Sequence, residues 1–179
     1  MAIDILLVNP VFLEQNQAER ELMNPYFPLG LLYLAAFIRE RGFNVEIFDG
    51  TFTEGPQAFV AALKEHRPIT VGITAVKPNR KMALKLASLA HAQGAKVVLG
   101  GPDPTSTPAT YLAAPEVDLV IHHEGELTLI EFLQKINQDQ DFRSLDGIAY
   151  RAKNNAVCIN PRREFILNLD ELPLPARDM

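Results

Sequence analysis

The chain has 179 residues and a formal net charge of −5, from 17 Lys and Arg against 22 Asp and Glu. With 47% hydrophobic and 22% charged residues, the composition excludes a wholly disordered chain and fits one globular domain with a short appendage. Because the sequence has no run of basic residues and no apolar stretch of roughly 18 residues, we expect neither a nucleic-acid surface nor a membrane span.

Strand and helix patterns alternate along the chain. Short, almost continuous apolar runs are typical of strands buried on both faces and predict strands over residues 3–8, 45–48, 69–74, 96–99 and 118–121. Apolar residues at helical spacing predict helices over residues 31–41, 56–66, 79–93, 109–114 and 126–137. We therefore expect an α/β fold: a Rossmann-like or flavodoxin-like five-stranded parallel sheet with helices on both faces and right-handed crossovers.

The pattern changes after residue 137. Residues 147–151 and 157–159 flank an Asn-rich turn and predict a β-hairpin, whose packing partner the sequence leaves open. The spacing of the prolines in the last segment is incompatible with a helix or a central strand and is typical of a semi-rigid connector. These observations predict three parts: an α/β domain over residues 1–137, a β-hairpin extension over 138–167 and a linker over 168–179.

Cysteine content and the N-terminal residues bear on the compartment. Cys158 is the only cysteine, which excludes a disulfide within the chain and an iron–sulfur cluster held by its own thiolates. No basic segment precedes an apolar core at the N-terminus, so no secretory signal is predicted. We therefore expect a cytoplasmic protein.

The residues that follow each strand are the candidates for binding, because ligands of open parallel sheets lie beyond the carboxyl ends of the strands. After the first strand, Asn9 and Pro10 stand where a dinucleotide fold needs G-x-G-x-x-G and a flavodoxin needs a Ser/Thr-rich phosphate cradle. The 18 residues between Asn9 and Pro28 predict a lid or binding segment, because loops of that length in compact domains are usually functional.

Small and polar residues follow the later strands. Gly100 and Gly101 allow a close approach of backbone to a ligand, and Thr105 can donate a hydroxyl hydrogen bond. Glu126 has two interpretations, since a carboxylate there favours the first turn of the next helix and can also border a ligand. His122 and His123 could ligate a metal or cobalt, but they are adjacent in a strand and point to opposite faces, so one should pack or face solvent and ligation by either is not expected.

In chain order, these pieces resemble one family. They are Asn9-Pro10, residues 28–35, residues 71–74, Gly100-Gly101-Pro102 and Glu124-Gly125-Glu126. Together they are similar to the N-terminal cobalamin-binding domain of B12-dependent radical SAM enzymes, the group that includes the anaerobic Mg-protoporphyrin monomethyl ester cyclase. Residues 170–178 look like the linker that precedes the radical SAM barrel of that family.

The resemblance implies that the chain is a fragment of a longer enzyme. SAM and a [4Fe–4S] cluster would belong to a barrel with a C-x3-C-x2-C motif outside this chain, in agreement with the single Cys158. That barrel would be the partner of this chain and would meet a small-molecule substrate. The parent would be a radical SAM methyltransferase or cyclase, and this chain alone should catalyse nothing.

The resemblance also implies which residues hold cobalamin. They are Asn9, Pro10, Thr74, Ala75, Val76, Gly100, Gly101, Pro102, Thr105, Glu124, Gly125 and Glu126. The D-x-H-x-x-G motif of the methionine-synthase type is replaced by residues 9–14, which contain no His. This implies a base-off cobalamin without a histidine ligand. Asp103 stands where many relatives have His in G-G-x-H-x-T, which leaves the role of this residue open.

Two alternatives stay open at this point. The first is a degenerate domain of the same fold without cobalamin, which serves a structural or docking role; the departure at Asp103 favours it. The second is a nucleotide-binding α/β module, in which Asp49 after the second strand would hold a ribose. Cobalamin binding separates the first alternative from the main hypothesis, and a thermal-shift screen with nucleotides tests the second.

Overall fold

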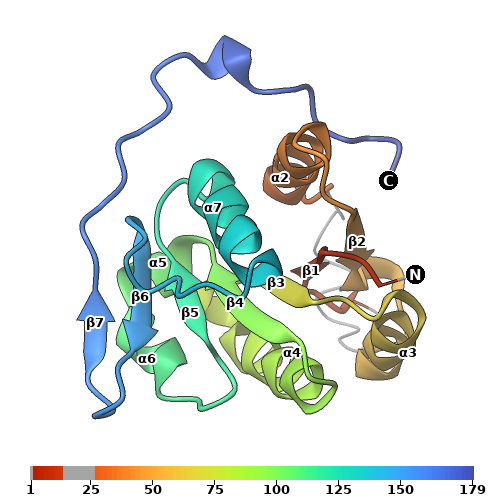
Figure 1. Ribbon diagram of the computed structural model, residues 1–179. Helices are drawn as coiled ribbons and strands as arrows, with labels where there is room; N and C mark the ends of the chain where they lie inside the picture. Colours follow the sequence, from red (N-terminus) through yellow and green to blue (C-terminus); the bar gives the residue numbers. More distant parts are fainter. Residues whose placement is uncertain (1, 14–26) are drawn as a thin grey trace.

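The computed structural model describes residues 2–13 and 27–179 (Figure 1). The predicted lid between Asn9 and Pro28 therefore lies mostly outside the described residues. The strands are β1 (Ile5–Asn9), β2 (Val45–Asp49), β3 (Thr70–Thr74), β4 (Lys96–Gly100), β5 (Leu119–Ile121), β6 (Ile148–Arg151) and β7 (Val157–Ile159). The α-helices are α2 (Leu29–Glu40), α3 (Pro56–His66), α4 (Arg80–Ala92), α5 (Pro102–Ser106), α6 (Pro108–Leu112) and α7 (Glu126–Asn137). The 3-10 helices within residues 2–13 and 27–179 are η2 (Gly50–Phe52), η3 (Lys77–Asn79) and η4 (Leu169–Glu171).

Helices cover both faces of the sheet, as the sequence predicts. In Figure 1, α2 and α7 lie side by side over one face, and α3 and α4 lie over the other. Successive residues of β1 face opposite sides. Leu6 belongs to the core with Phe59 and Leu86 of α3 and α4, whereas Leu7 belongs to the core with Phe132 of α7.

The strand order β2-β1-β3-β4-β5-β6-β7 places β1 between β2 and β3. All pairs from β2 to β5 are parallel. The chain therefore moves to one side of β1 and then to the other, and the direction of winding reverses between β1 and β3. At such a reversal the crossovers diverge and leave a crevice at the carboxyl ends of the strands.

The five predicted parallel strands are present, and the predicted hairpin joins the same sheet, so that the described residues form a mixed sheet of seven strands. Ile121 of β5 pairs with Ile148 of β6 in antiparallel register, and Ala149 of β6 pairs with Ile159 of β7. Ile148 and Ala149 are fully buried. The unpaired backbone groups at the outer edge of β5 need partners, and β6 supplies them while it buries apolar side chains on both faces.

One predicted loop is helical. The chain turns into α5 directly after Gly101, and a second short helix, α6, corresponds to the predicted helix over residues 109–114 with slightly earlier bounds. Pro102 and Pro108 stand at the first position of these two helices, where the fixed φ of proline favours the helix and its missing N–H costs nothing.

The C-terminal segment runs from β7 past α7 to α2 (Figure 1). The backbone N–H of Ile166 donates to Glu124 Oε2 over 2.9 Å. The N–H of Ala176 donates to the carbonyl of Leu32 over 3.1 Å, and the Ala176 side chain is buried against α2 and α7. These contacts fix the segment to the face that α2 and α7 cover.

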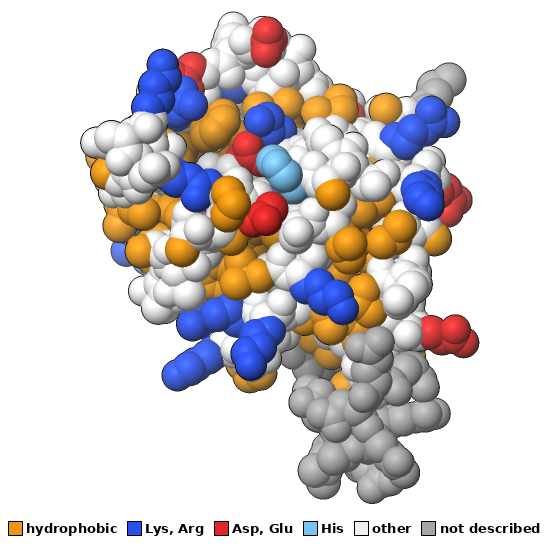
Figure 2. Space-filling view, turned by 90° about the horizontal axis from the view of Figure 1, so that it is seen from below, with side chains coloured by type: hydrophobic (Ala, Val, Ile, Leu, Met, Phe, Trp, Pro, Cys, Tyr) orange, Lys and Arg blue, Asp and Glu red, His pale blue; other side chains and the backbone are white. Residues whose placement is uncertain are grey.

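Charges of both signs lie on the surface. Figure 2 shows Lys and Arg side chains spread over one face, with hydrophobic and acidic side chains between them. The basic side chains on that face do not form one continuous patch. Among the described residues, no helix has the length and apolar character needed to cross a membrane.

Candidate functional site

A cavity of about 600 Å³ opens at the carboxyl edge of the sheet, under α2 and α7. Leu7, Gly72 and Val98 form its floor, and they are direct neighbours in the register of β1, β3 and β4. Leu34 of α2 and Leu129 of α7 are part of its walls. The cavity therefore lies at the crevice that the topology creates, and its lining is mostly apolar, as is usual for small-molecule sites of this size.

Nine of the twelve predicted site residues line this cavity: Asn9, Thr74, Val76, Gly100, Gly101, Pro102, Glu124, Gly125 and Glu126. The other three, Pro10, Ala75 and Thr105, lie outside the lining. Ala75 is fully buried on the side of α4, where its N–H donates to the carbonyl of Gly100 over 2.9 Å. Thr105 Oγ1 accepts a hydrogen bond from the N–H of His123 over 3.2 Å. Ala75 and Thr105 thus contact the backbone of residues in the lining.

The two glycines after β4 differ in what surrounds them. A Cβ on Gly101 would lie 2.8 Å from Thr74 Oγ1 and 2.9 Å from the carbonyl oxygen of Ala75, and its φ of 98° strains any other residue. A Cβ on Gly100 would meet nothing closer than 3.8 Å, at the carbonyl oxygen of Ile121. Gly101 is therefore required by the fold itself, whereas Gly100 leaves open space in the cavity.

Two carboxylates stand at the start of α7. Glu124 Oε2 accepts the N–H of Ile166. Glu126 is the first residue of α7, and its Oε2 is buried without a hydrogen-bond partner among the described residues. A buried acceptor without a donor costs free energy. Glu126 therefore presents an unused acceptor at the wall of the cavity.

A comparison with known families identifies the domain that contains this cavity. Residues 20–133 match the model of the B12 binding domain, which is well over half of the chain. The chain belongs to the B12-binding domain family.

Relatives of this B12-binding domain include proteins of known and unknown activity. An uncharacterized methyltransferase of Pyrococcus horikoshii is 35% identical over 156 residues, which are 85% of this chain and 34% of that protein. The anaerobic magnesium-protoporphyrin IX monomethyl ester cyclase of Rubrivivax gelatinosus is 24% identical over 176 residues, 94% of this chain and 31% of that protein. The chain thus spans about a third of the length of these relatives.

Solved structures share the fold of the B12-binding domain. The cobalamin-dependent S-adenosylmethionine radical enzyme OxsB with aqua-cobalamin bound matches 99% of this chain and 24% of its own chain, with a TM-score of 0.85 at 20% identity. The predicted fold class is confirmed, and so is the resemblance to the cobalamin domains of radical SAM enzymes.

Asp49, the residue of the nucleotide alternative, is engaged in the turn after β2. Its Oδ1 accepts hydrogen bonds from Asn9 Nδ2 over 2.9 Å and from the N–H and Oγ1 of Thr51 over 3.0 and 2.6 Å. These contacts occupy Oδ1 of Asp49 with donors from β1 and from the turn itself. Asp49 is also absent from the lining of the cavity, so the arrangement does not favour a ribose site in this B12-binding domain.

The adjacent histidines lie in different surroundings. His122 is buried, with Nε2 unpartnered among the described residues, and burial lowers its pKa, with the neighbouring His123 acting in the same direction. His123 is exposed and lines the cavity, whereas His66, His91 and His122 do not. In the described part of the B12-binding domain, no group of three or more His, Cys, Asp or Glu residues is placed to hold a metal ion.

Sequence reasoning missed the apolar wall of the site. It consists of Phe27, Leu29, Leu31 and Leu34 at the start of α2, with Ile121 and Leu129 opposite. Leu31 and Leu34 are three residues apart and share one helix face, which is the one signal in the sequence that could have indicated a wall. Gly72 was missed as well. It interrupts an otherwise apolar strand, and a glycine at such a position can mark a close approach of a ligand.

Proposed function

We propose that the cavity of this B12-binding domain binds cobalamin. The observation that carries the proposal is the apolar trough at the strand reversal, in which Gly100 leaves open space for a ligand beside the floor of Leu7, Gly72 and Val98. A corrin is large, mostly apolar and edged with amides, and it needs an apolar surface with a few backbone and carboxylate partners. A cavity of about 600 Å³ suits the nucleotide tail, with the corrin at the open mouth.

The nine predicted residues that line the cavity are the proposed contacts. The backbone of Gly100 and Gly101 would approach the tail, with Thr74 and Val76 beside it, and the carboxylate of Glu126 would accept an amide N–H. Pro10, Ala75 and Thr105 would support these contacts from outside the lining.

The proposed cobalamin is base-off and takes no histidine ligand from this chain. Replacing His123, the histidine that lines the cavity, should therefore leave the cobalt signal unchanged. The measurement is electron paramagnetic resonance of bound cob(II)alamin in the wild type and in His123→Ala. Equal spectra without nitrogen splitting from a protein ligand are expected; a splitting that the substitution removes would assign His123 to cobalt.

For the parent protein we propose a cytoplasmic radical SAM methyltransferase or cyclase. When bound, cobalamin supplies a methyl carrier or an electron partner, and the protein provides positioning. SAM and the [4Fe–4S] cluster would be held by another part of the parent chain, because Cys158 is the only cysteine here. Residues 168–179 would lead to that part, which would also receive the small-molecule substrate, and the α/β domain and hairpin extension would keep cobalamin in place.

Thermal unfolding with candidate ligands tests the class of ligand. At 100 times its Kd, hydroxocobalamin should stabilise the chain by about 2.7 kcal/mol, which raises Tm by roughly 5–10 °C for a chain of this size. Far-ultraviolet circular dichroism follows the transition, with ATP and NAD⁺ as comparison ligands. A shift with nucleotides and none with hydroxocobalamin would favour the nucleotide module, and no shift with any ligand would favour a docking domain.

A further inference from the structure

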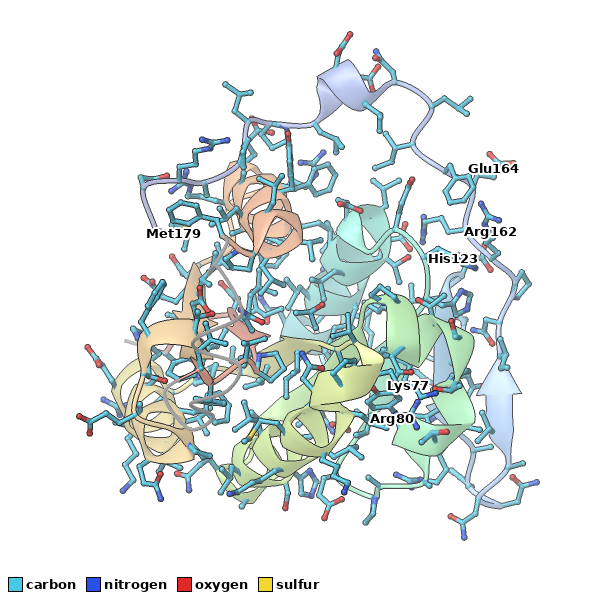
Figure 3. All side chains as sticks on the ribbon, turned by 180° about the vertical axis from the view of Figure 1, so that it is seen from behind. Lys77, Arg80, His123, Arg162, Glu164 and Met179 are labelled. Atoms are coloured by element: carbon cyan, nitrogen blue, oxygen red, sulfur yellow. The ribbon has the colours of Figure 1, made fainter. Side chains whose placement is uncertain are left out.

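Asp103 lies in a buried cluster behind the wall of the cavity. Its side chain is 8% exposed and accepts two hydrogen bonds from Arg80, Nε to Oδ2 and Nη2 to Oδ1, each over 2.7 Å. The hydroxyl of the fully buried Tyr111 donates to Asp103 Oδ2 over 2.5 Å. Figure 3 shows Arg80 beside α5 and α6, with Lys77 next to it. The carboxylate is thus held by a planar cation on one side and a phenol on the other.

The cluster joins two loops that line the cavity. Arg80 is the first residue of α4 and follows Val76 and Asn79, which line the cavity and are connected by a 2.9 Å hydrogen bond from the N–H of Val76 to Asn79 Oδ1. Asp103 directly follows Gly101 and Pro102 of the other loop. The bidentate pair therefore connects the β3–α4 loop, residues 75–79, to the β4–α5 loop, which we define as Gly101 together with Pro102 and Asp103 of the first turn of α5.

Backbone contacts place the same two loops against each other. The N–H of Ala75 donates to the carbonyl of Gly100, and the N–H of Asp103 donates to the carbonyl of Ala75 over 3.3 Å. A shift of Asp103 would move Gly101, which already lies in close contact with Thr74 and Ala75. Because packed loops in such contact move together, a displacement of the Asp103 side chain also displaces the residues of the cavity wall.

We propose that Asp103, held by Arg80 and Tyr111, is a positioning residue that fixes the separation of the β3–α4 and β4–α5 loops and thereby the shape of the cobalamin site. This inference rests on the proposed function. The charge state of the cluster agrees with it: Arg80 lowers the pKa of Asp103, and burial together with Asp103 raises the pKa of Tyr111. At neutral pH the Asp103 carboxylate accepts hydrogen bonds and the Tyr111 hydroxyl donates one, so the hydrogen bonds of the cluster have a single arrangement.

A second ion pair provides a matched control. Lys96 Nζ lies 3.0 Å from Asp118 Oδ1, and Asp118 Oδ2 accepts the N–H of Val97 over 2.8 Å. This pair also joins two segments through a carboxylate with two donors. It sits at the amino-terminal end of β4, and neither Lys96 nor Asp118 lines the cavity.

The test compares Asp103→Asn with Asp118→Asn by two measurements on the whole chain. Amide hydrogen exchange without ligand reports the loops directly, and a titration reports the Kd for hydroxocobalamin. Asp103→Asn should speed exchange in residues 75–79 and 101–107 and raise Kd about tenfold. Asp118→Asn should lower Tm but leave both loops and Kd as in the wild type. Wild-type exchange in both loops of Asp103→Asn would overturn the inference.

Arg80→Lys provides the second variant if Asp103→Asn does not fold. Lysine keeps the charge but loses the two-pronged geometry, so the same changes in exchange and Kd are expected, and unchanged loops would refute the positioning role. If neither the wild-type chain nor its full-length parent binds cobalamin, the proposed function fails, and the exchange measurement still decides whether the cluster holds the loops.

Discussion

Gly100→Val should abolish retention of cobalamin and leave the free energy of unfolding within about 1 kcal/mol of the wild type. Gly100 is the last residue of β4, two residues after Val98, so a side chain there points to the same face, into the cavity. A Cβ has space, since its nearest contact is at 3.8 Å, and valine is well suited to a strand. The branched side chain would instead fill room that the ligand needs.

A variant of the neighbouring Gly101 shows what loss of stability looks like, as opposed to a blocked cavity. Gly101→Ala places a methyl group 2.8 Å from Thr74 Oγ1 at a φ of 98°, and strain plus overlap should cost about 2–4 kcal/mol of stability. Urea unfolding and a cobalamin titration of both variants distinguish the two effects. If Gly100→Val keeps both its stability and full cobalamin binding, the cavity is not the site.

Glu126→Leu should weaken cobalamin binding by about 10- to 100-fold, the range expected for one hydrogen bond to a charged group. It should not lower Tm of the free chain, because the buried Oε2 of Glu126 has no partner among the described residues that could be lost. Removing the buried, unpaired Oε2 of the partly buried Glu126 relieves its desolvation cost, which offsets the lost interaction with the α7 dipole, about 0.3–1 kcal/mol.

Two matched variants give this prediction its controls. Glu126→Gln keeps the shape and one acceptor and should lose only part of the affinity. Leu127→Gln changes the next residue of α7, which is 38% exposed and does not line the cavity, and should bind as the wild type does. A drop in Tm of Glu126→Leu with unchanged Kd would show that Glu126 serves the helix and not the ligand.

Strand ends were predictable from the sequence because apolar runs and the residues after them are local signals. Asn9, Thr74 and Gly100 end neighbouring parallel strands, so they had to meet at one edge. Pro10 and Ala75 each follow a residue that lines the cavity and lie outside the lining themselves, because side chains alternate along a strand. Thr105 lies outside the lining in α5, a helix that the sequence pattern did not predict.

Non-local packing accounts for what the sequence could not indicate. The pairing of β6 with β5 joins residues far apart in the chain, and no local pattern distinguishes it from a separate hairpin. The wall formed by α2 and α7 depends on how two helices lie side by side, and the partner of Asp103 is Arg80, 23 positions earlier. Such contacts depend on the tertiary structure and leave no local pattern in the sequence.

The most direct test of cobalamin binding is a titration of the purified chain and of its full-length parent with hydroxocobalamin, read by visible absorbance after desalting. Both proteins should retain close to one equivalent with a base-off spectrum. Retention by the parent alone would show that another part of the parent completes the site. No retained cobalamin in either protein would contradict the proposed function and leave a docking domain of the same fold.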